Sequence, residues 1–229
     1  MLGYGQAMPT ITLLERQKRQ KDRVNVYLDG EYVFSLNEMD AASLRKGQQL
    51  SEIELAQLRE KDAIERIFAR GLDALSRRPL SEQELRRKLL RQQVSEAVVD
   101  AALLRLRQYG YLDDATFAQS WVQSRNRSQP RGQRALRYEL RQKGISDAHI
   151  AAALGTHHDE EAAAYQLARG RVLRFAGMTR REYREKLGSL LQRRGFSYEI
   201  ARRVLDQIAS EMLEEDPDFF ANAPDEDDF

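Results

Sequence analysis

Residues 81–103 read SEQELRRKLLRQQVSEAVVDAAL, and this stretch decides the fold because its skeleton recurs twice at a spacing of 51 residues. The copies are GQRALRYELRQKGISDAHIAAAL at 132–154 and YREKLGSLLQRRGFSYEIARRVL at 183–205. All three carry leucine at the fifth, ninth and last positions and serine at the fifteenth. Such a repeat indicates a supersecondary unit stacked in tandem, so we expect an extended functional surface rather than a single cleft.

The turn inside each copy explains why the skeleton repeats. Gly144 and Gly195 suit the left-handed position that ends a helix, whereas the first copy has the costlier Gln93 there. A serine then caps the next helix, and the apolar residues on either side of it can pack together as a hydrophobic staple. The predicted staples are Val94 with Val99, Ile145 with Ile150, and Phe196 with Ala201.

A further helix precedes each copy. Before the first copy, one apolar stripe with helical spacing is formed by Ile64, Ile67, Phe68, Leu72 and Leu75. Ser51 and Ser81 are each followed three residues later by glutamate, which is the capping box that starts a helix. We therefore predict a mostly α chain, a tandem array of three three-helix repeats with a period of about 51 residues and a small N-terminal β-hairpin subdomain.

The N-terminal subdomain is predicted from the alternation of polar and apolar residues at 24–28, followed by the turn Asp29-Gly30. Pairing Leu28 with Tyr32 rather than with Glu31 collects six apolar residues on one face, which requires a longer loop or a bulge after Gly30. These residues are Val24, Val26, Leu28, Tyr32, Phe34 and Leu36. We expect two or three strands, with the basic residues Arg16, Lys18, Arg19, Lys21 and Arg23 on an exposed connection.

The predicted organisation has five parts. The hairpin subdomain covers residues 1–50, of which 1–8 are expected to be disordered. A linker helix and repeat 1 occupy 51–112, repeat 2 occupies 113–155, and repeat 3 occupies 156–210. Residues 211–229 are expected to form a disordered acidic tail because they lack any apolar periodicity.

The net charge of +1 conceals a strong segregation of charge along the chain. Residues 64–210 hold 28 Arg and Lys against 17 Asp and Glu, a net of +11. Residues 211–229 hold nine acidic residues and no basic one. A basic body that is rich in arginine favours a polyanion binder, but Arg–Glu pairs on exposed helix faces explain the same composition.

Several functional classes are excluded or disfavoured by what the sequence lacks. There is no cysteine, so neither a disulfide framework nor a thiolate metal site can form. No apolar run approaches the roughly 18 residues that span a bilayer, and no phosphate-binding loop motif is present. Three histidines, two of them adjacent in the polar stretch 157–160, suggest no metal site. We expect a cytoplasmic protein without catalytic residues, metal or cofactor.

The positive functional signal is arginine at recurring places in the repeats. In repeat 2, residues 127, 131, 134, 137 and 141 are predicted to form a ridge that faces one way. Tyr109, Tyr111 and Tyr138 lie among the arginines, and either stacking on bases or packing at the rim explains them. The candidate binding residues are Arg77, Arg78, Arg86, Arg87, Arg125, Arg127, Arg131, Arg134, Arg137, Arg141, Arg180, Arg181, Arg193 and Arg194.

The chain resembles the RecX regulatory family at motifs spread over about residues 60–205. The motifs are RPLSEQELRRKL at 78–89, GYLDD at 110–114 with the following Phe117-Ala118 and Trp121-Val122, and Lys143-Gly144-Ile145. The N-terminal hairpin is similar to an extension found in many members. Repeat 3 matches more loosely, and the acidic tail is not part of the family pattern.

This resemblance implies three-helix repeats that bind the RecA recombinase and lie along the helical groove of its filament on single-stranded DNA. Members usually lower recombination, ATP hydrolysis and co-protease activity, whereas a few act as activators. We therefore expect a monomeric regulator of homologous recombination, DNA repair and the SOS response, with some affinity for single-stranded DNA. Two alternatives stay open, a sequence-nonspecific nucleic-acid-binding helical module and a helical-repeat scaffold for another protein.

Overall fold

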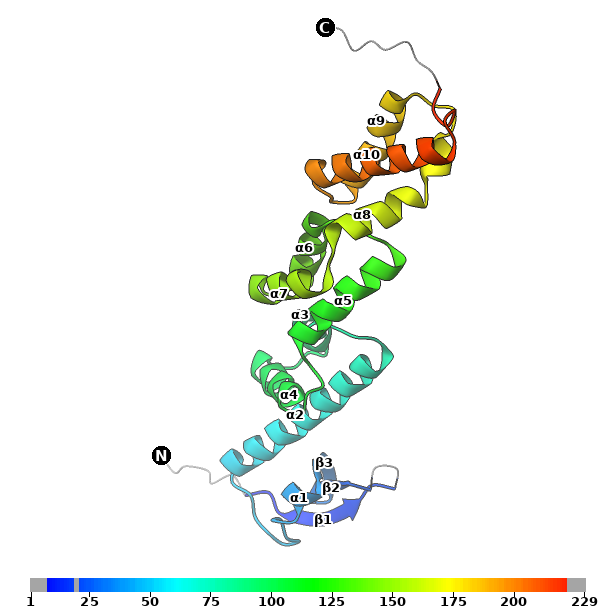
Figure 1. Ribbon diagram of the computed structural model, residues 1–229. Coiled ribbons are helices and arrows are strands. Elements are labelled where there is room, and N and C mark those ends of the chain that lie inside the picture. Colours follow the sequence, from blue (N-terminus) through cyan, green and yellow to red (C-terminus); the bar gives the residue numbers. More distant parts are fainter. Residues whose placement is uncertain (1–7, 19–20, 222–229) are drawn as a thin grey trace. The chain divides into compact units, whose positions relative to one another are not determined.

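The computed structural model describes residues 8–18 and 21–221. Two compact units make up the chain, with the boundary between Leu112 and Asp113 (Figure 1). The first unit holds a three-stranded sheet and helices α1 to α4, and the second holds helices α5 to α10. This confirms a mostly helical chain with a small N-terminal sheet.

The sheet contains β1 (Ile11–Arg16), β2 (Arg23–Leu28) and β3 (Glu31–Asn37) in antiparallel order β1-β2-β3. A two-residue turn pairs Leu28 with Glu31, and the register then shifts because Tyr27 pairs with Tyr32 whereas Val26 pairs with Phe34. The bulge expected after Gly30 is therefore present at Val33. The expected pairing of Leu28 with Tyr32 was wrong, and Tyr32 is exposed because the bulge comes after it in β3.

A long helix joins the sheet to repeat 1. After the short α1 (Glu38–Ala41), α2 (Glu52–Arg77) packs its first half on the sheet through Leu55 and Leu58 (Figure 1). Its second half packs against α3 (Glu82–Leu90) and α4 (Glu96–Gln108). The linker helix and the first helix of repeat 1 are thus one continuous helix, which begins at the predicted capping box.

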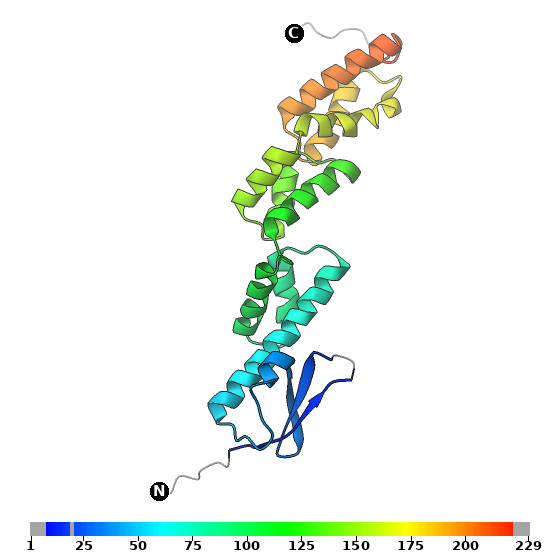
Figure 2. The ribbon, with the colours of Figure 1, turned by 60° about the horizontal axis from the view of Figure 1, so that its bottom comes forward.

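The second unit repeats the same three-helix arrangement twice. Repeat 2 consists of α5 (Asp114–Ser128), α6 (Gln133–Gln142) and α7 (Asp147–His157). Repeat 3 consists of α8 (Glu160–Arg169), the 3-10 helix η1 (Val172–Phe175), α9 (Arg180–Arg193) and α10 (Tyr198–Glu215). In each repeat the third helix packs beside the first, as Figure 2 shows for the bundles of both units. The recurring leucines Leu85, Leu136 and Leu187 are fully buried.

The turn between the second and third helices is the same in all three repeats. Gln93, Gly144 and Gly195 have φ angles of 57°, 82° and 89°, which places all three in the left-handed region. The serine two positions later accepts a hydrogen bond from the backbone N–H three residues on, as predicted for an N-cap. Gln93 adopts this conformation without the freedom of glycine, so the repeat geometry overrides the local cost.

The expectation of a disordered tail from residue 211 was wrong as far as residue 221. The helix α10 extends to Glu215, and Met212, Phe219 and Phe220 are buried in the core of repeat 3. The segment 216–221 is held by hydrogen bonds from Gly177 N to Phe219 O and from Ala221 N to Met178 O. In this segment Asp216 and Asp218 face water while Phe219 and Phe220 pack inward, a division that composition alone conceals. Residues 222–229 lie outside the described part of the chain.

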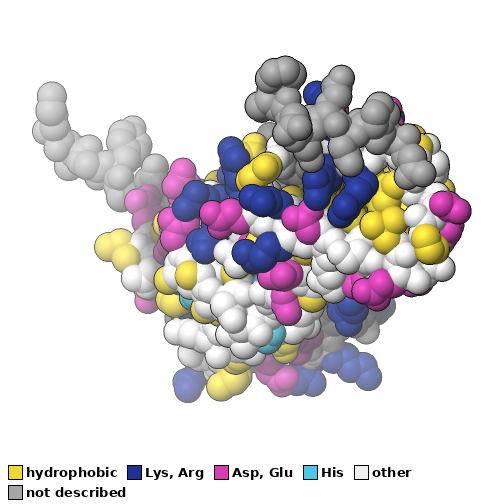
Figure 3. All heavy atoms as spheres, turned by 45° about the horizontal axis from the view of Figure 1, so that its top comes forward, with side chains coloured by type: hydrophobic (Ala, Val, Ile, Leu, Met, Phe, Trp, Pro, Cys, Tyr) yellow, Lys and Arg dark blue, Asp and Glu magenta, His cyan; other side chains and the backbone are white. Residues whose placement is uncertain are grey.

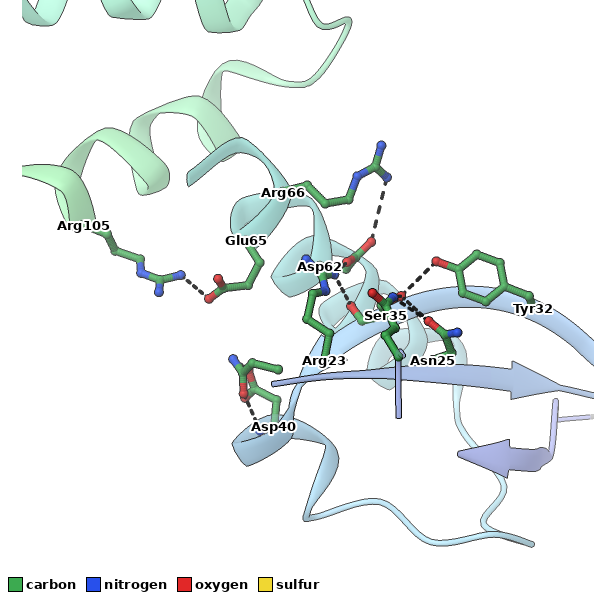
Figure 4. Close-up of polar contacts among 11 residues, drawn as sticks. Arg23, Asn25, Tyr32, Ser35, Asp40, Asp62, Glu65, Arg66 and Arg105 are labelled. Atoms are coloured by element: carbon green, nitrogen blue, oxygen red, sulfur yellow. Dashed lines mark hydrogen bonds and ion pairs between the residues drawn. The ribbon is translucent and has the colours of Figure 1, made fainter. Parts of the chain in front are cut away.

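The basic cluster at 16–23 is also divided differently from the prediction. Lys18 and Lys21 are exposed, but Arg23 opens β2 and forms an ion pair with Asp62 of α2, which is 5 % exposed (Figure 4). Ser35 of β3 is buried beside this pair and donates to Asn25. A polar network therefore fastens the sheet to α2 across the apolar core.

Candidate interaction surface

Three predicted candidates of unit 1 are held in ion pairs. Arg77 lies 2.9 Å from Asp73, and Arg78 lies 3.6 Å from Glu84. Arg86 of α3 reaches Asp100 and Glu96 of α4, and its hydrogen bond lowers the pKa of the Asp100 carboxyl. All these pairs are solvent-exposed at one or both partners, so each pair contributes little to stability, and the carboxylates offset the charge of these three arginines.

In repeat 2, Glu139 of α6 forms ion pairs with two further candidate binding residues, Arg125 and Arg131. One of its carboxylate oxygens accepts from Arg125 Nε at 2.9 Å and from Trp121 Nε1 at 2.8 Å. The other lies 2.8 Å from Arg131 Nε. The guanidinium of Arg125 and the ammonium of Lys143 lie 4.5 and 4.1 Å from the Trp121 ring. Arg125 and Arg131 are thus held within the α5–α6 packing.

A separate face of α6 lines an open groove of about 830 Å³. Arg134, Arg137, Tyr138 and Arg141 line it, and they lie one helical turn or two apart on the same side of the helix. The opposite wall comes from the α9–α10 turn and the start of α10, with Gln192, Phe196 and Tyr198. We call this the α6 groove; it lies between repeats 2 and 3, inside one compact unit.

Two glycines hold the walls of the α6 groove together. Gly132, at the N-cap of α6, donates its backbone N–H to the carbonyl of Arg194 at 3.1 Å. A Cβ on Gly132 would overlap the backbone of Gly195, and a Cβ on Gly195 would overlap Ala135. Glu160 of α8 accepts from Gln133 N at 2.9 Å, so this carboxylate caps α6 and is already engaged. The two repeats therefore meet backbone to backbone at this point.

The α6 groove holds three arginines against one lining carboxylate, that of Glu160, which caps α6. Within residues 8–18 and 21–221, no carboxylate lies within ion-pairing distance of Arg134 or Arg137. Arg141 pairs with Asp147 at 2.8 Å, but both side chains are mostly exposed. Tyr138 and Tyr198 are 66 % and 67 % exposed. The groove therefore offers three guanidinium groups and two aromatic rings to a ligand.

The ridge predicted over residues 127–141 is shorter than expected. Only Arg134, Arg137 and Arg141 line the groove; α5 ends at Ser128 and α6 begins at Gln133, so Arg131 sits in the connection and turns to Glu139. Arg127 is exposed on the last turn of α5. Figure 3 shows basic and acidic side chains interspersed on the face that it presents, in agreement with the many ion pairs.

The remaining candidates lie on other elements. Arg87 is exposed on α3, Arg180 and Arg181 are exposed in the first turn of α9, and Arg193 is exposed in its last turn. Arg194 is half-buried at the C-cap of α9. None of these five has a carboxylate at ion-pairing distance in the part of the chain that the structure describes.

The polar sequence at 157–160 indicates a solvated loop, but the structure places the two adjacent histidines at the end of α7. His157 is the last residue of α7, and His158 is half-buried beside α5. Asn126 donates to the carbonyl of His157 and lies 2.9 Å from Nδ1 of His158. Burial lowers the pKa of His158. Among the described residues, no three histidine or carboxylate side chains are grouped as a metal would need.

The far wall of the groove, above all Tyr198, was not predicted from the sequence. The repeat spacing could have shown it, because Glu96 and Asp147 occupy the equivalent positions and a tyrosine replaces them in the third copy. The capping box of Thr179 and Glu182, which starts α9, was also not predicted.

Across residues 8–18 and 21–221, none of the helices combines the length and apolar character needed to cross a membrane.

Four family models match the chain in succession. They are the regulatory protein RecX N-terminal domain over residues 9–51, and the first, second and third three-helix domains of RecX over 68–106, 113–154 and 159–205. The matches follow the sheet and the three repeats in chain order.

Curated relatives and solved structures agree with these matches. The chain is 31 % identical over 213 residues to "Regulatory protein RecX" of Bacillus pumilus, covering 91 % of this chain and 81 % of the relative. It is 32 % identical over 210 residues to that of Clostridium acetobutylicum, covering 88 % and 97 %. A crystal structure of regulatory protein RecX is similar with a TM-score of 0.73 and 30 % identity, over 87 % of this chain and 100 % of that one. RecX from Lactobacillus salivarius, with a TM-score of 0.61 and 22 % identity over 65 % and 98 %, shares the fold.

Proposed function

The chain belongs to the RecX family of regulatory proteins, and from this premise we propose that it binds the RecA recombinase filament on single-stranded DNA and inhibits it. The inhibited activities are ATP hydrolysis, strand exchange and co-protease activity. Membership of this family supports RecA as the partner, and the relatives are named regulatory proteins. The protein acts in the cytoplasm as a single chain, by binding rather than by catalysis.

The α6 groove supports this proposal and indicates which residues bind the filament. It combines Arg134, Arg137 and Arg141 on one helix face against one lining carboxylate, which suits the anionic surface of a filament that contains DNA. Arg125 and Arg131 have a structural role instead, because Glu139 holds both. Binding at the groove would occupy filament surface that growth or strand exchange requires.

A titration of RecA filaments with the purified protein tests the proposal. DNA-dependent ATP hydrolysis should fall at ratios below one protein per RecA subunit, because one bound chain can block several subunits along a filament. Reversing Arg134, Arg137 and Arg141 to glutamate should abolish inhibition without changing helicity. The matched control reverses Arg59, Arg70 and Arg174, which are exposed on α2 and η1 and are not among the predicted binding residues. Undiminished ATP hydrolysis at a molar excess of the wild-type protein would refute the function.

The charge distribution favours one second candidate, a nucleic-acid-binding protein that acts through DNA alone. Residues 64–210 carry a net charge of +11, and several arginines lack a carboxylate partner among the described residues. Contact with about five phosphates of a single strand gives a slope near −3.5 for log K against log salt. If inhibition of RecA persists at a salt concentration that has removed DNA binding, this second candidate is excluded.

A further inference from the structure

We propose that the α6 groove binds single-stranded nucleic acid directly, with the arginines of α6 on phosphates and Tyr138 and Tyr198 stacked on bases. This assignment rests on the proposed function for its biological setting, but the binding itself needs no recombinase. According to this assignment, the groove contacts the single-stranded DNA within a filament rather than the recombinase subunits.

The arginines are placed to follow a phosphate backbone. Arg134, Arg137 and Arg141 span two turns on one side of α6, about 10.5 Å along the helix axis. The guanidinium group binds phosphate through paired N–H donors, and it loses less hydration than an ammonium group when it does so. Because Arg134 and Arg137 have no carboxylate partner among the described residues, binding a phosphate there breaks no ion pair.

The two tyrosines distinguish a nucleic-acid ligand from an acidic protein surface. Tyr138 and Tyr198 are each about two-thirds exposed, come from different elements, and line the same groove. In the described part of the chain, neither ring packs against another aromatic ring, whereas Tyr109 stands beside both Phe68 and Tyr111. An acidic peptide would use the arginines and leave these rings in water. Unpaired bases provide flat faces that cover them.

The groove is also fixed before a ligand arrives. Its two walls meet at the contact between Gly132 and Gly195, and Glu160 holds the start of α6. Gln133 and Gln192 add amide groups that can hydrogen-bond to base edges without demanding one sequence. Bases already paired in a duplex cannot reach the rings, so a single strand is the ligand that fits both features.

Fluorescence anisotropy of a short labelled oligothymidylate, with the full chain and no recombinase, tests this assignment. Changing either tyrosine to alanine should weaken binding by roughly 5- to 150-fold, because base–aromatic stacking contributes about 1–3 kcal/mol per base, and changing both should weaken it further. Tyr138→Phe and Tyr198→Phe should retain the affinity, since phenylalanine keeps the ring. Changing Arg134, Arg137 and Arg141 to glutamine should reduce the salt slope of log K by about 2.

Two controls keep the result specific. Glutamine at Arg59, Arg70 and Arg174, which are exposed and lie outside both the groove and the predicted binding residues, removes the same charge and should leave most of the affinity. A duplex of the same length should bind more weakly and should not respond to the tyrosine changes. Equal losses from the groove and control variants would overturn the assignment, as would an affinity for single strands that does not depend on the tyrosines.

The failure of this assignment can be separated from failure of the proposed function. If the groove variants keep the affinity for single-stranded DNA but lose inhibition of RecA, the groove contacts protein and the nucleic-acid assignment is wrong. If single-strand binding depends on the groove while RecA activity is unaffected by the wild-type protein, the assignment stands and the proposed function falls.

Discussion

At the scale of single residues, the pair of Arg23 and Asp62 shows how charge is used inside unit 1. Asp62 is almost fully buried, Arg66 lies 3.9 Å from it on the next turn, and Arg23 Nε is buried without a hydrogen-bond partner among the described residues (Figure 4). A buried ion pair costs desolvation, so its gain lies in fixing how the sheet meets α2.

Asp62→Ala should lower the free energy of unfolding by about 3–5 kcal/mol, because it leaves the guanidinium of Arg23 buried and uncompensated. Urea denaturation followed by circular dichroism measures the change. The double variant Arg23→Met with Asp62→Leu should recover most of the loss, since it removes both charges. A single variant within 1 kcal/mol of the wild type, roughly the worth of an exposed pair, would contradict the structural role given to this pair.

Acid should destabilise unit 2 through His158. Burial lowers the pKa of this imidazole below its usual 6.5 despite the opposing field of Asp159. As the pH falls through about 6.5, the unfolded chain therefore takes up the proton before the folded chain does. The free energy of unfolding should be constant above that pH and fall below it. Urea midpoints measured on both sides of this pH test the expectation, and His158→Gln should flatten the profile. A variant with the same pH dependence as the wild type would exclude His158 as the cause.

At the scale of elements, the turn between the second and third helices does two things. It closes each repeat through a left-handed residue and a serine cap, and in repeat 3 it also packs on the start of α6. That second contact explains why the N-cap of α6 is Gly132, although the equivalent N-cap of repeat 1 is the capping serine Ser81. The side-chain cap is given up so that two backbones can approach.

Gly132→Ala should destabilise unit 2 by an amount typical of overpacking, about 1–3 kcal/mol, and should weaken binding at the α6 groove. The added methyl group has no space, because it meets the carbonyl group of Gly195. Gly155→Ala is the matched control in α7, where a Cβ meets nothing within 4 Å, and it should raise stability by about 0.5–1 kcal/mol. Thermal unfolding of both variants distinguishes these outcomes; a Gly132 variant as stable as the control would show that the junction can relax.

At the scale of the whole molecule, charge is segregated along the chain while much of the basic charge is paired locally. The last residues are acidic, and they follow a segment whose two phenylalanines belong to the core of repeat 3. Phe220 lies against the buried Tyr183, with ring centroids 5.1 Å apart. The core of repeat 3 therefore extends past residue 211 at least as far as Phe220.

Two truncations separate the structural and electrostatic roles of this C-terminal region. Ending the chain after Ala221 removes Asp225, Glu226, Asp227 and Asp228, so stability should be unchanged and affinity for polyanions should rise, most clearly at low salt. Ending it after Leu213 also removes Phe219 and Phe220 and should cost at least about 3 kcal/mol in the free energy of unfolding. Calorimetry and heparin binding measure the two effects. Unchanged polyanion affinity in the shorter truncation would rule out competition by the acidic residues.

The sequence alone determined the features that depend on neighbours along the chain. The spacing of 51 residues, the leucines, the serine caps and the left-handed glycines predicted the three repeats and their internal turns, because helix periodicity and capping are local. The family resemblance rested on motifs within these repeats, at 78–89, 110–122 and 143–145, and was confirmed by the comparisons. Even Gln93 was placed correctly by its position in the repeat.

Only the tertiary structure decided which arginines are available and what stands opposite them. Glu139 is eight residues from Arg131 and fourteen from Arg125, and nothing in the spacing distinguishes these two from Arg134 or Arg137. Tyr198 reaches the α6 groove because Gly132 and Gly195 bring distant segments together. Phe219 and Phe220 are ordered because repeat 3 offers them a core. Which residue a charged or aromatic side chain contacts depends on how helices distant in the sequence pack together. The local sequence pattern around that side chain does not determine this packing.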